Sequence, residues 1–209
     1  MSATTKYVEE IFADVKTEYG QPMEIVQRVA VLLLAEMGDY IPTALDLGAG
    51  AGRHALPLAR AGFSVTAIDS RDCDIDPLNG TANKEELALR GIVADIRAWR
   101  IPKEYDLVVS TFALHYVSRE CGLRLVTDIQ SKTLSGGYNV IAGFVGGGDL
   151  FDLDSARERL WFSPMELLNF YQGWEILDYS EHQTRCRKCK PDASPMFNAA
   201  VHILARKPR

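Results

Sequence analysis

The chain has 209 residues, of which 47% are hydrophobic and 24% charged, and its formal net charge is −5. This balance is typical of a folded globular domain and argues against disordered, collagen-like and coiled-coil proteins. No apolar run approaches the roughly 20 residues that cross a bilayer, so we expect no membrane partner. The acidic net charge also argues against nucleic acid as a partner, because duplex-binding proteins concentrate Lys and Arg against phosphates.

The length fits one domain over residues 1–209. The first residues, Met-Ser-Ala-Thr-Thr-Lys, lack the apolar stretch of a secretory signal, so we expect a cytoplasmic protein. Its four cysteines (Cys73, Cys121, Cys186 and Cys189) are then reduced thiols. Monomer and homodimer both stay open.

Hydrophobic spacing predicts two N-terminal helices, over residues 7–19 and 22–37. Beyond them, short apolar strands alternate with helices, and a polar acidic loop is expected over 70–77. The predicted strands are 43–47, 63–68, 91–94, 105–110 and 138–144, and the predicted helices are 53–61, 81–90 and 121–134. Such alternation predicts right-handed crossovers and a parallel sheet.

The end of the chain follows a different pattern. A short helix is expected over 164–171, with Ser163 as its N-cap and Glu166 as the partner in a capping box. The segments 174–184 and 196–206 then predict two strands with no helix between them. They form an antiparallel hairpin at the far side of the sheet, which makes seven strands in all.

A glycine-rich loop joins the first predicted strand to its helix. Its spacing is Gly-x-Gly-x-Gly, whereas dinucleotide-binding loops have Gly-x-Gly-x-x-Gly, and Arg53 stands at the last position of that pattern. Asp46, two residues before the first glycine, would accept hydrogen bonds from an ammonium group but repel a pyrophosphate. The loop residues expected at the ligand are Asp46, Gly48, Ala49, Gly50, Gly52 and Arg53.

Acidic side chains follow the next two strands. Asp69 is placed to accept both ribose hydroxyls of a nucleoside, and Asp95 with Ile96 to contact the adenine ring. A nucleoside that carries an amino acid and no phosphate is S-adenosylmethionine. Ser70 completes the ribose side of this site, and Ser110 and Thr111 border it at the end of the fourth strand.

These motifs resemble, in order and spacing, those of the class I S-adenosylmethionine-dependent methyltransferases. The segments 136–142, 162–175 and 204–207 look like the tellurite-resistance methyltransferase family. The resemblance implies a Rossmann-like α/β fold, with a seven-stranded mostly parallel sheet, a C-terminal antiparallel hairpin and helices on both faces. Residues 41–209 would be this core. Residues 1–40 would form two helices that either pack on the core or act as a lid over the cofactor, with Tyr7 and Tyr19 as contacts in the second case.

The same resemblance implies an enzyme that converts S-adenosylmethionine to S-adenosylhomocysteine and methylates an oxyanion of tellurium or selenium. The base-methylating motifs Asn-Pro-Pro-Tyr and Pro-Cys are absent, which favours a small-molecule acceptor. Arg187 and Lys188 stand where the family has a His-Arg pair, and His182 is a substitute for the missing histidine. Physically, the basic run 185–190 suits an oxyanion, although a solvated hairpin tip is the alternative.

Several interpretations stay open. His115 is a candidate general base, or it packs beside the cofactor. Cys186 and Cys189 are inert thiols, a redox pair or ligands for a soft metalloid, and we expect no metal site. The Asp149, Asp152 and Asp154 series is expected to be solvated. The alternative functions are methylation of another small O, N or S nucleophile, a non-catalytic S-adenosylmethionine-binding protein, and a nicotinamide oxidoreductase.

Overall fold

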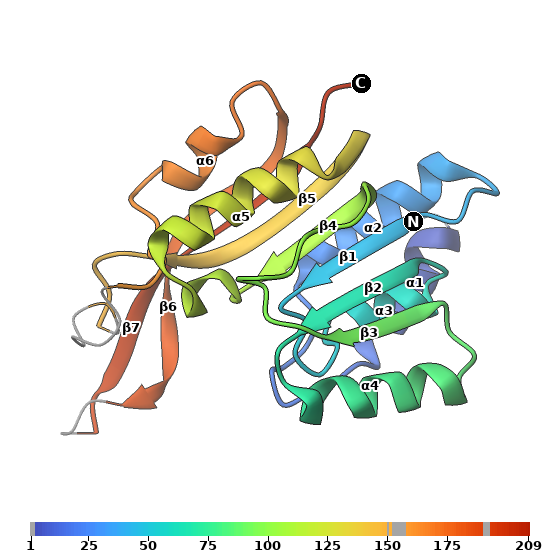
Figure 1. Cartoon of the computed structure of the whole chain (residues 1–209), viewed down its shortest axis with the longest axis horizontal. Helices are drawn as coiled ribbons and strands as arrows, with labels where there is room; N and C mark the ends of the chain where they lie inside the picture. The colour runs from blue at the N-terminus through green and yellow to red at the C-terminus, as the bar shows by residue number, and fades with distance from the viewer. Residues whose placement is uncertain (1–2, 150, 152–157, 190–192) are drawn as a thin grey trace.

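The computed structural model describes residues 3–149, 151, 158–189 and 193–209, and for residues 186–189 it describes the backbone alone. A seven-stranded sheet with the order β3-β2-β1-β4-β5-β7-β6 crosses the molecule (Figure 1). The strands are β1 (Thr43–Leu47), β2 (Ser64–Asp69), β3 (Leu89–Val93), β4 (Tyr105–Thr111), β5 (Thr133–Val145), β6 (Glu175–Cys189) and β7 (Pro195–Arg206).

The first five strands pair in parallel, and β7 is antiparallel to both of its neighbours. The predicted seven-stranded α/β sheet with a C-terminal hairpin is therefore confirmed. The strand order reverses between β1 and β4, and open α/β sheets bind their ligands at the carboxyl ends of strands beside such a switch point.

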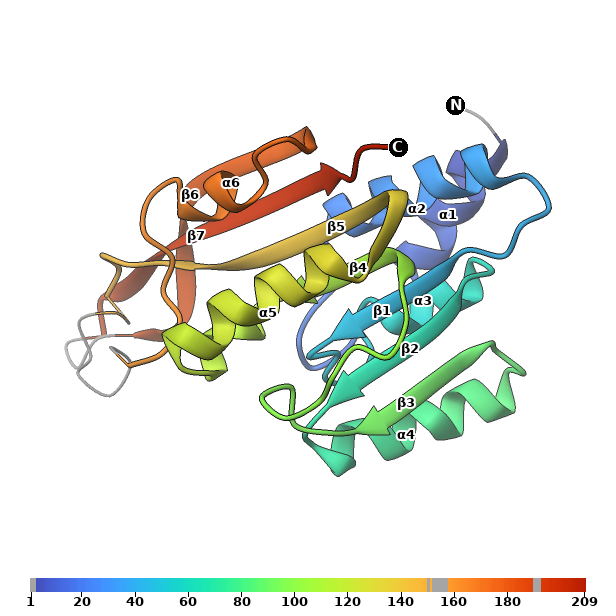
Figure 2. The ribbon, with the colours of Figure 1, turned by 45° about the horizontal axis from the view of Figure 1, so that its top comes forward.

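Helices cover both faces of the sheet. They are α1 (Ala3–Ala13), α2 (Glu24–Met37), α3 (Ala55–Arg60), α4 (Asp72–Lys84), the 3-10 helix η1 (Leu114–Tyr116), α5 (Arg119–Ser131) and α6 (Glu166–Phe170). The first four contribute to one buried cluster, and α5 and α6 to a second on the opposite face. Figure 2 shows α5 in front of β4 and β5, with α1 and α2 behind the sheet.

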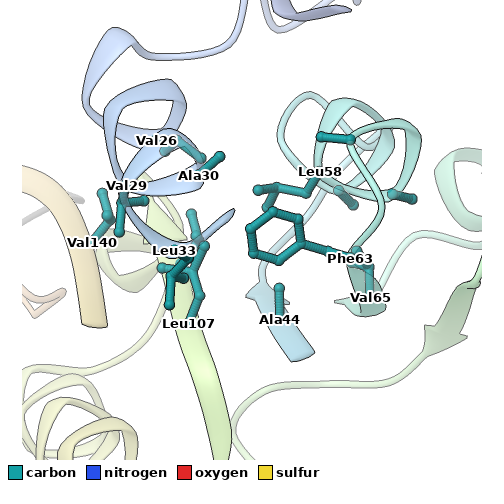
Figure 3. Close-up of a cluster of buried hydrophobic side chains, with 14 of the residues drawn as sticks. Val26, Val29, Ala30, Leu33, Ala44, Leu58, Phe63, Val65, Leu107 and Val140 are labelled. Atoms are coloured by element: carbon teal, nitrogen blue, oxygen red, sulfur yellow. The ribbon is translucent and has the colours of Figure 1, made fainter. Parts of the chain in front are cut away.

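Neighbouring residues of the central strands point to opposite clusters, which is why these strands are apolar throughout. Ala44 and Leu107 belong to the first cluster, and Leu45 and Val108 to the second. Figure 3 shows part of the first cluster, where one face of α2 packs on the sheet beside Leu58 and Phe63. The labelled side chains are Val26, Val29, Ala30, Leu33, Ala44, Leu58, Phe63, Val65, Leu107 and Val140.

Two of the predicted helices have wrong bounds. The first ends at Ala13 instead of residue 19, because Thr17 and Gly20 form a tight turn in which Gly20 has a φ of 96°. The helix expected over 81–90 instead runs from Asp72 to Lys84 and contains Pro77. Its buried residues Ile75 and Leu78 pack into the core, so tertiary contact outweighs the proline and the acidic sequence.

The junctions around β5 and α6 also differ from the prediction. The helix before β5 ends at Ser131, and β5 begins at Thr133 and passes through Gly136 at a φ of 77°. Ser163 is not the N-cap of α6, because that helix starts at Glu166 after Met165 at a φ of 62°. Half of the capping box is nevertheless present, since the Glu166 carboxylate accepts the N–H of Ser163 at 2.8 Å.

The C-terminal hairpin is longer than β5. The last residue of β5, Val145, pairs with Ala199, yet β6 and β7 continue to the pairs Arg185–Phe197 and Cys189–Pro195. Residues 184–189 and 195–198, here called the hairpin arm, therefore extend past the carboxyl end of β5 (Figure 1). This is the edge of the sheet where the glycine-rich loop also lies.

In the described part of the chain, no helix has both the length and the apolar character needed to span a membrane.

Candidate functional site

The glycine-rich loop runs from the carboxyl end of β1 into α3, and its glycines adopt backbone angles that other residues rarely do. Gly48, Gly50 and Gly52 have φ values of 80°, 52° and 81°. A Cβ at Gly48 would lie 2.2 Å from the Cβ of Ala113, and one at Gly50 would lie 2.8 Å from the ring of Tyr19. The loop is therefore pressed between β4 and an N-terminal segment, and its backbone alone fits there.

Asp69 holds this loop from the end of β2. One carboxylate oxygen accepts the N–H of Gly50 at 2.8 Å, and the other accepts the N–H of Arg71 at 3.0 Å. The side chain is half-buried at the carboxyl edge of the sheet. Asp69 thus lies beside the glycine-rich loop, and Ser70 next to it is exposed. The contact of Asp69 with a ribose stays a prediction.

Asp46 faces inward. It is 1% exposed, and its carboxylate accepts the N–H of Ala55 in the first turn of α3 at 3.1 Å. Burial raises its pKa to about 7, against an opposing effect of the Arg53 charge. In this structure Asp46 joins β1 to α3, and its contact with a ligand ammonium stays a prediction. Ala49 is also buried, within the first hydrophobic cluster.

Asp95, which follows β3, pairs with an arginine that no motif in the sequence indicated. Arg97 pairs with Asp95 at 2.5 Å and also donates its backbone N–H to it at 2.9 Å, which lowers the pKa of that carboxyl. Ile96 packs against the second hydrophobic cluster. The carboxylate of Asp95 is thus held in place at the sheet edge, and its contact with an adenine stays a prediction.

At the end of β4, the two expected residues have different roles. Ser110 is fully buried and donates to the carbonyl of Leu47 at 2.9 Å, so its hydroxyl links β4 to β1. A contact of Ser110 with a ligand stays a prediction. Thr111 accepts a hydrogen bond from Arg53 at 2.9 Å, and Arg53 also donates to the carbonyl of Tyr19 at 3.1 Å.

Arg53 therefore connects the glycine-rich loop, β4 and residues 14–23, which we call the N-terminal strap. The Tyr19 hydroxyl donates to Asp74 at 2.9 Å and accepts from Arg71 at 2.6 Å. The strap, rather than α1, covers the loop. Tyr7 was expected at the cofactor, but it donates to the carbonyl of Arg60 at the far end of α3.

We expect Arg53→Ala to loosen the strap, because it removes the charged donor from both Tyr19 and Thr111. Hydrogen bonds to charged groups contribute about 1.5–3 kcal/mol, so exchange of the strap amides should become roughly 10-fold faster or more. Hydrogen–deuterium exchange of a peptide over residues 14–23 measures this. Arg90→Ala, which removes an exposed cation on β3, should leave exchange in the strap unchanged, and equal exchange in both variants would contradict the role of Arg53.

His115 lies in η1, beyond Thr111. Its Nδ1 atom is buried and accepts no hydrogen bond within the described part of the chain. Burial, with a smaller effect of the Arg159 charge, lowers the pKa of the imidazole to about 4. In the tautomer protonated at Nε2, the unpartnered Nδ1 can accept a proton, while the lowered pKa makes the ring a weaker base than a free histidine.

The other residues predicted at the acceptor lie on β6. His182 is exposed, its Nδ1 is 3.3 Å from the Ser180 hydroxyl, and its ring centre is 5.8 Å from that of His202. His182 is in register with Ala200 of β7, which pairs with Phe144 of β5. Arg187 and Lys188 belong to the backbone of the hairpin arm, but their side chains, like those of Cys186 and Cys189, lie outside the described part, as do Asp152 and Asp154.

Aromatic side chains gather beside His115, and no spacing pattern in the sequence indicated them. The centre of the group is Phe144, whose ring centroid is 4.9 Å from that of His115, 5.0 Å from Phe112 and 5.6 Å from Trp161. These residues come from the segment after β4, from η1, from β5 and from the segment before α6. We call the group the aromatic cluster; its members are Phe112, His115, Tyr116, Phe144, Phe151 and Trp161.

The chain was compared with known families and proteins. The model of the family "Tellurite resistance protein TehB" matches residues 34–195. The chain belongs to the TehB family. The family predicted from the motifs of the glycine-rich loop and the second half is thereby confirmed.

Among its relatives is the "Probable S-adenosyl-L-methionine-dependent methyltransferase TehB" of Haemophilus influenzae strain 10810. It is 32% identical over 78% of this chain and 56% of its own length. The crystal structure of TehB from Haemophilus influenzae has a TM-score of 0.72 and 29% identity, and covers 86% of this chain and 62% of that one. The chain thus spans little more than half the length of the curated TehB relative.

A more distant structure shows the fold alone. Magnesium protoporphyrin IX methyltransferase (ChlM) from Synechocystis PCC 6803, solved with bound S-adenosylhomocysteine, has a TM-score of 0.65 at 15% identity. The match covers 99% of this chain and 88% of that one. The class I methyltransferase fold expected from the sequence is confirmed by these likenesses.

Proposed function

We propose that this chain binds S-adenosylmethionine and transfers its methyl group to a small-molecule acceptor. The observation that carries the proposal is that Asp69 accepts a hydrogen bond from the glycine-rich loop at the switch point of a class I methyltransferase fold. The TehB family, with a relative named as a methyltransferase, supports the same reaction.

The residues present suit this cofactor. The glycines of the loop let a ligand approach its backbone closely, Asp69 offers its oxygens to ribose hydroxyls, and Asp95 lies where a nucleoside base would extend. When bound, S-adenosylmethionine supplies an activated methyl group and leaves as neutral S-adenosylhomocysteine. The protein therefore has no leaving group to protonate, and its task is to align the acceptor and, where the acceptor carries a proton, to remove it.

The proposed acceptor is an oxyanion of tellurium or selenium. The hairpin arm supports this choice, because it extends past β5 at the edge that carries the glycine-rich loop and brings Arg185, Arg187 and Lys188 along its backbone. Arginine binds oxyanions with two parallel N–H donors, and lysine as a point charge. His182, on the same strand, is the nearest histidine in sequence to these cations.

The double variant Arg187→Ala/Lys188→Ala tests this acceptor. We expect kcat/KM for selenite or tellurite, followed as formation of S-adenosylhomocysteine, to fall roughly 10-fold or more, since two charged contacts are lost. Affinity for S-adenosylmethionine should stay unchanged. A sensitive bacterial host that carries the double variant should likewise lose protection against tellurite.

The matched control is Lys84→Ala/Arg90→Ala, which removes two exposed cations at the opposite edge of the sheet. It should retain full activity. Equal activity of both double variants toward the oxyanions would exclude the arm as their binding site. A wild-type protein that binds the cofactor but methylates no acceptor would favour a non-catalytic S-adenosylmethionine-binding protein.

A further inference from the structure

The aromatic cluster lies next to the proposed cofactor site. It begins at Phe112, directly after Thr111 at the carboxyl end of β4, and the following Ala113 is the residue that a Cβ at Gly48 would meet. Thr111 and Ala113, on either side of Phe112, thus lie against the glycine-rich loop. The cluster therefore lies next to the position that the methyl group of a cofactor bound at that loop would take.

The backbone at Phe112 is strained. Its φ is 52°, a region that residues other than glycine, asparagine and aspartate seldom adopt, and its N–H donates to the carbonyl of Ala142 at 2.7 Å. Strain of this kind persists where the surrounding structure enforces it, often beside an active site. Here it places the Phe112 ring against Phe144.

The rings present both apolar surface and a proton acceptor. Phe112 and Phe144 are half-buried and Tyr116 is 69% exposed, so part of the cluster is open to a ligand. The Nδ1 atom of His115 is buried among these rings without a partner in the described chain. Such a surface favours an uncharged ligand with a removable proton.

The arginine that follows η1, Arg119, already has partners within the protein. Arg119 donates to the carbonyl of Trp161 at 2.7 Å and forms an ion pair with Glu166. Arg159 is exposed, and its charge acts on His115 from outside the cluster. Arg119 is thus held by Glu166, whereas the rings stay open to a soft, polarisable acceptor and the Arg159 charge favours the ionised form of that acceptor.

We propose that the aromatic cluster binds a second class of methyl acceptor, an uncharged organic thiol or selenol, with Nδ1 of His115 as the base. This rests on the proposed methyl transfer from S-adenosylmethionine. The acceptor sulfur or selenium forms a bond to the methyl carbon, and the bond from that carbon to the sulfonium sulfur breaks with its electrons staying on that sulfur. The thiol proton passes to Nδ1 and then to water, and neither an oxidant nor a reductant is required.

Two thiols that carry a benzene ring distinguish an effect on binding from an effect on proton removal. Benzyl mercaptan is protonated near neutral pH, whereas para-nitrothiophenol is already ionised. We expect both to be methylated by the wild-type protein. His115→Phe keeps a ring but removes the base, so kcat for benzyl mercaptan should fall about 100-fold, while kcat for para-nitrothiophenol changes less than about 3-fold.

Phe112→Gly tests the rings and keeps the backbone conformation, because glycine adopts a φ of 52° without strain. KM for both thiols should rise about 10-fold, and circular dichroism of the variant checks that it is folded. Tyr7→Leu, which removes a half-exposed ring on α1, is the control and should change neither KM.

The outcomes distinguish this proposal from the function on which it rests. Turnover of selenite with no turnover of either thiol would overturn the aromatic acceptor site and leave methyl transfer standing. An equal loss for both thiols in His115→Phe would overturn the base, and an unchanged KM in Phe112→Gly would overturn binding at the cluster. Failure of the wild-type protein to bind S-adenosylmethionine in calorimetry would overturn both proposals.

Discussion

Asp69→Ala should weaken the binding of S-adenosylmethionine about 100-fold or more. In the proposed complex its carboxylate accepts the ribose hydroxyls, and hydrogen bonds to a charged group contribute about 1.5–3 kcal/mol each. The same carboxylate positions the N–H of Gly50 in the glycine-rich loop, so the variant loses part of the loop geometry as well. Isothermal titration calorimetry with the wild-type protein and the variant measures the change in Kd.

A matched variant separates the lost contact from the lost charge. Asp76→Ala removes one exposed carboxylate from α4, a short distance along the chain, and should bind the cofactor as the wild type does. Asp69→Asn should be intermediate, because its amide oxygen retains one acceptor. Binding of wild-type strength in Asp69→Ala would show that the nucleoside does not lie across the end of β2.

The second large effect is expected from Asp46, whose burial links its protonation to folding. Its pKa rises from the ordinary value near 3.8 to about 7 in the folded protein. Between these values the folded chain holds the proton more tightly than the unfolded chain, so the free energy of unfolding decreases as the pH rises from about 4 to 7. Above pH 7 the folded protein carries the full cost of a buried carboxylate.

Asp46→Asn should remove that part of the pH dependence. The free energy of unfolding of the variant minus that of the wild type should be a few kcal/mol larger at pH 8 than at pH 5. The reason is that the asparagine amide is uncharged at both pH values, whereas the buried carboxyl of the wild type ionises. Urea unfolding at pH 5, 6, 7 and 8 measures this difference. Asp39→Asn, which changes an exposed residue, should follow the wild type at every pH, and a pH-independent effect of Asp46→Asn would show that the buried carboxyl does not titrate with folding.

Much of the fold could be predicted because its strands are short apolar runs bounded by glycine or aspartate. The range 43–47 was predicted for β1 and is observed, and the apolar run at 107–109 marked a strand buried on both faces. Strand and helix alternation then dictated the parallel sheet. In the site, the spacing of the glycines and the position of Asp69 after β2 placed the loop and its carboxylate partner at one edge.

The predictions that failed depended on contacts between distant segments. The helix through Pro77 exists because Ile75 and Leu78 are buried by the rest of the fold, which a local pattern cannot express. The N-terminal helix ends at Ala13, and the strap that follows it is held against the loop by Arg53 and Asp74. The pairing of β4 with β1 likewise directs the Ser110 hydroxyl to Leu47, a contact that the local sequence does not indicate.

The sequence by itself therefore determined the sheet, the glycine-rich loop and the family, because these depend on apolar periodicity and on residue spacing along the chain. Tertiary structure alone decided which way Asp46 faces, that Tyr19 covers Gly50, and that Phe144 of β5 lies against His115 and links it to rings after β4 and before α6. The physical reason is that burial, pKa and ring packing arise from side chains far apart in sequence, and their positions are fixed only when the core is assembled.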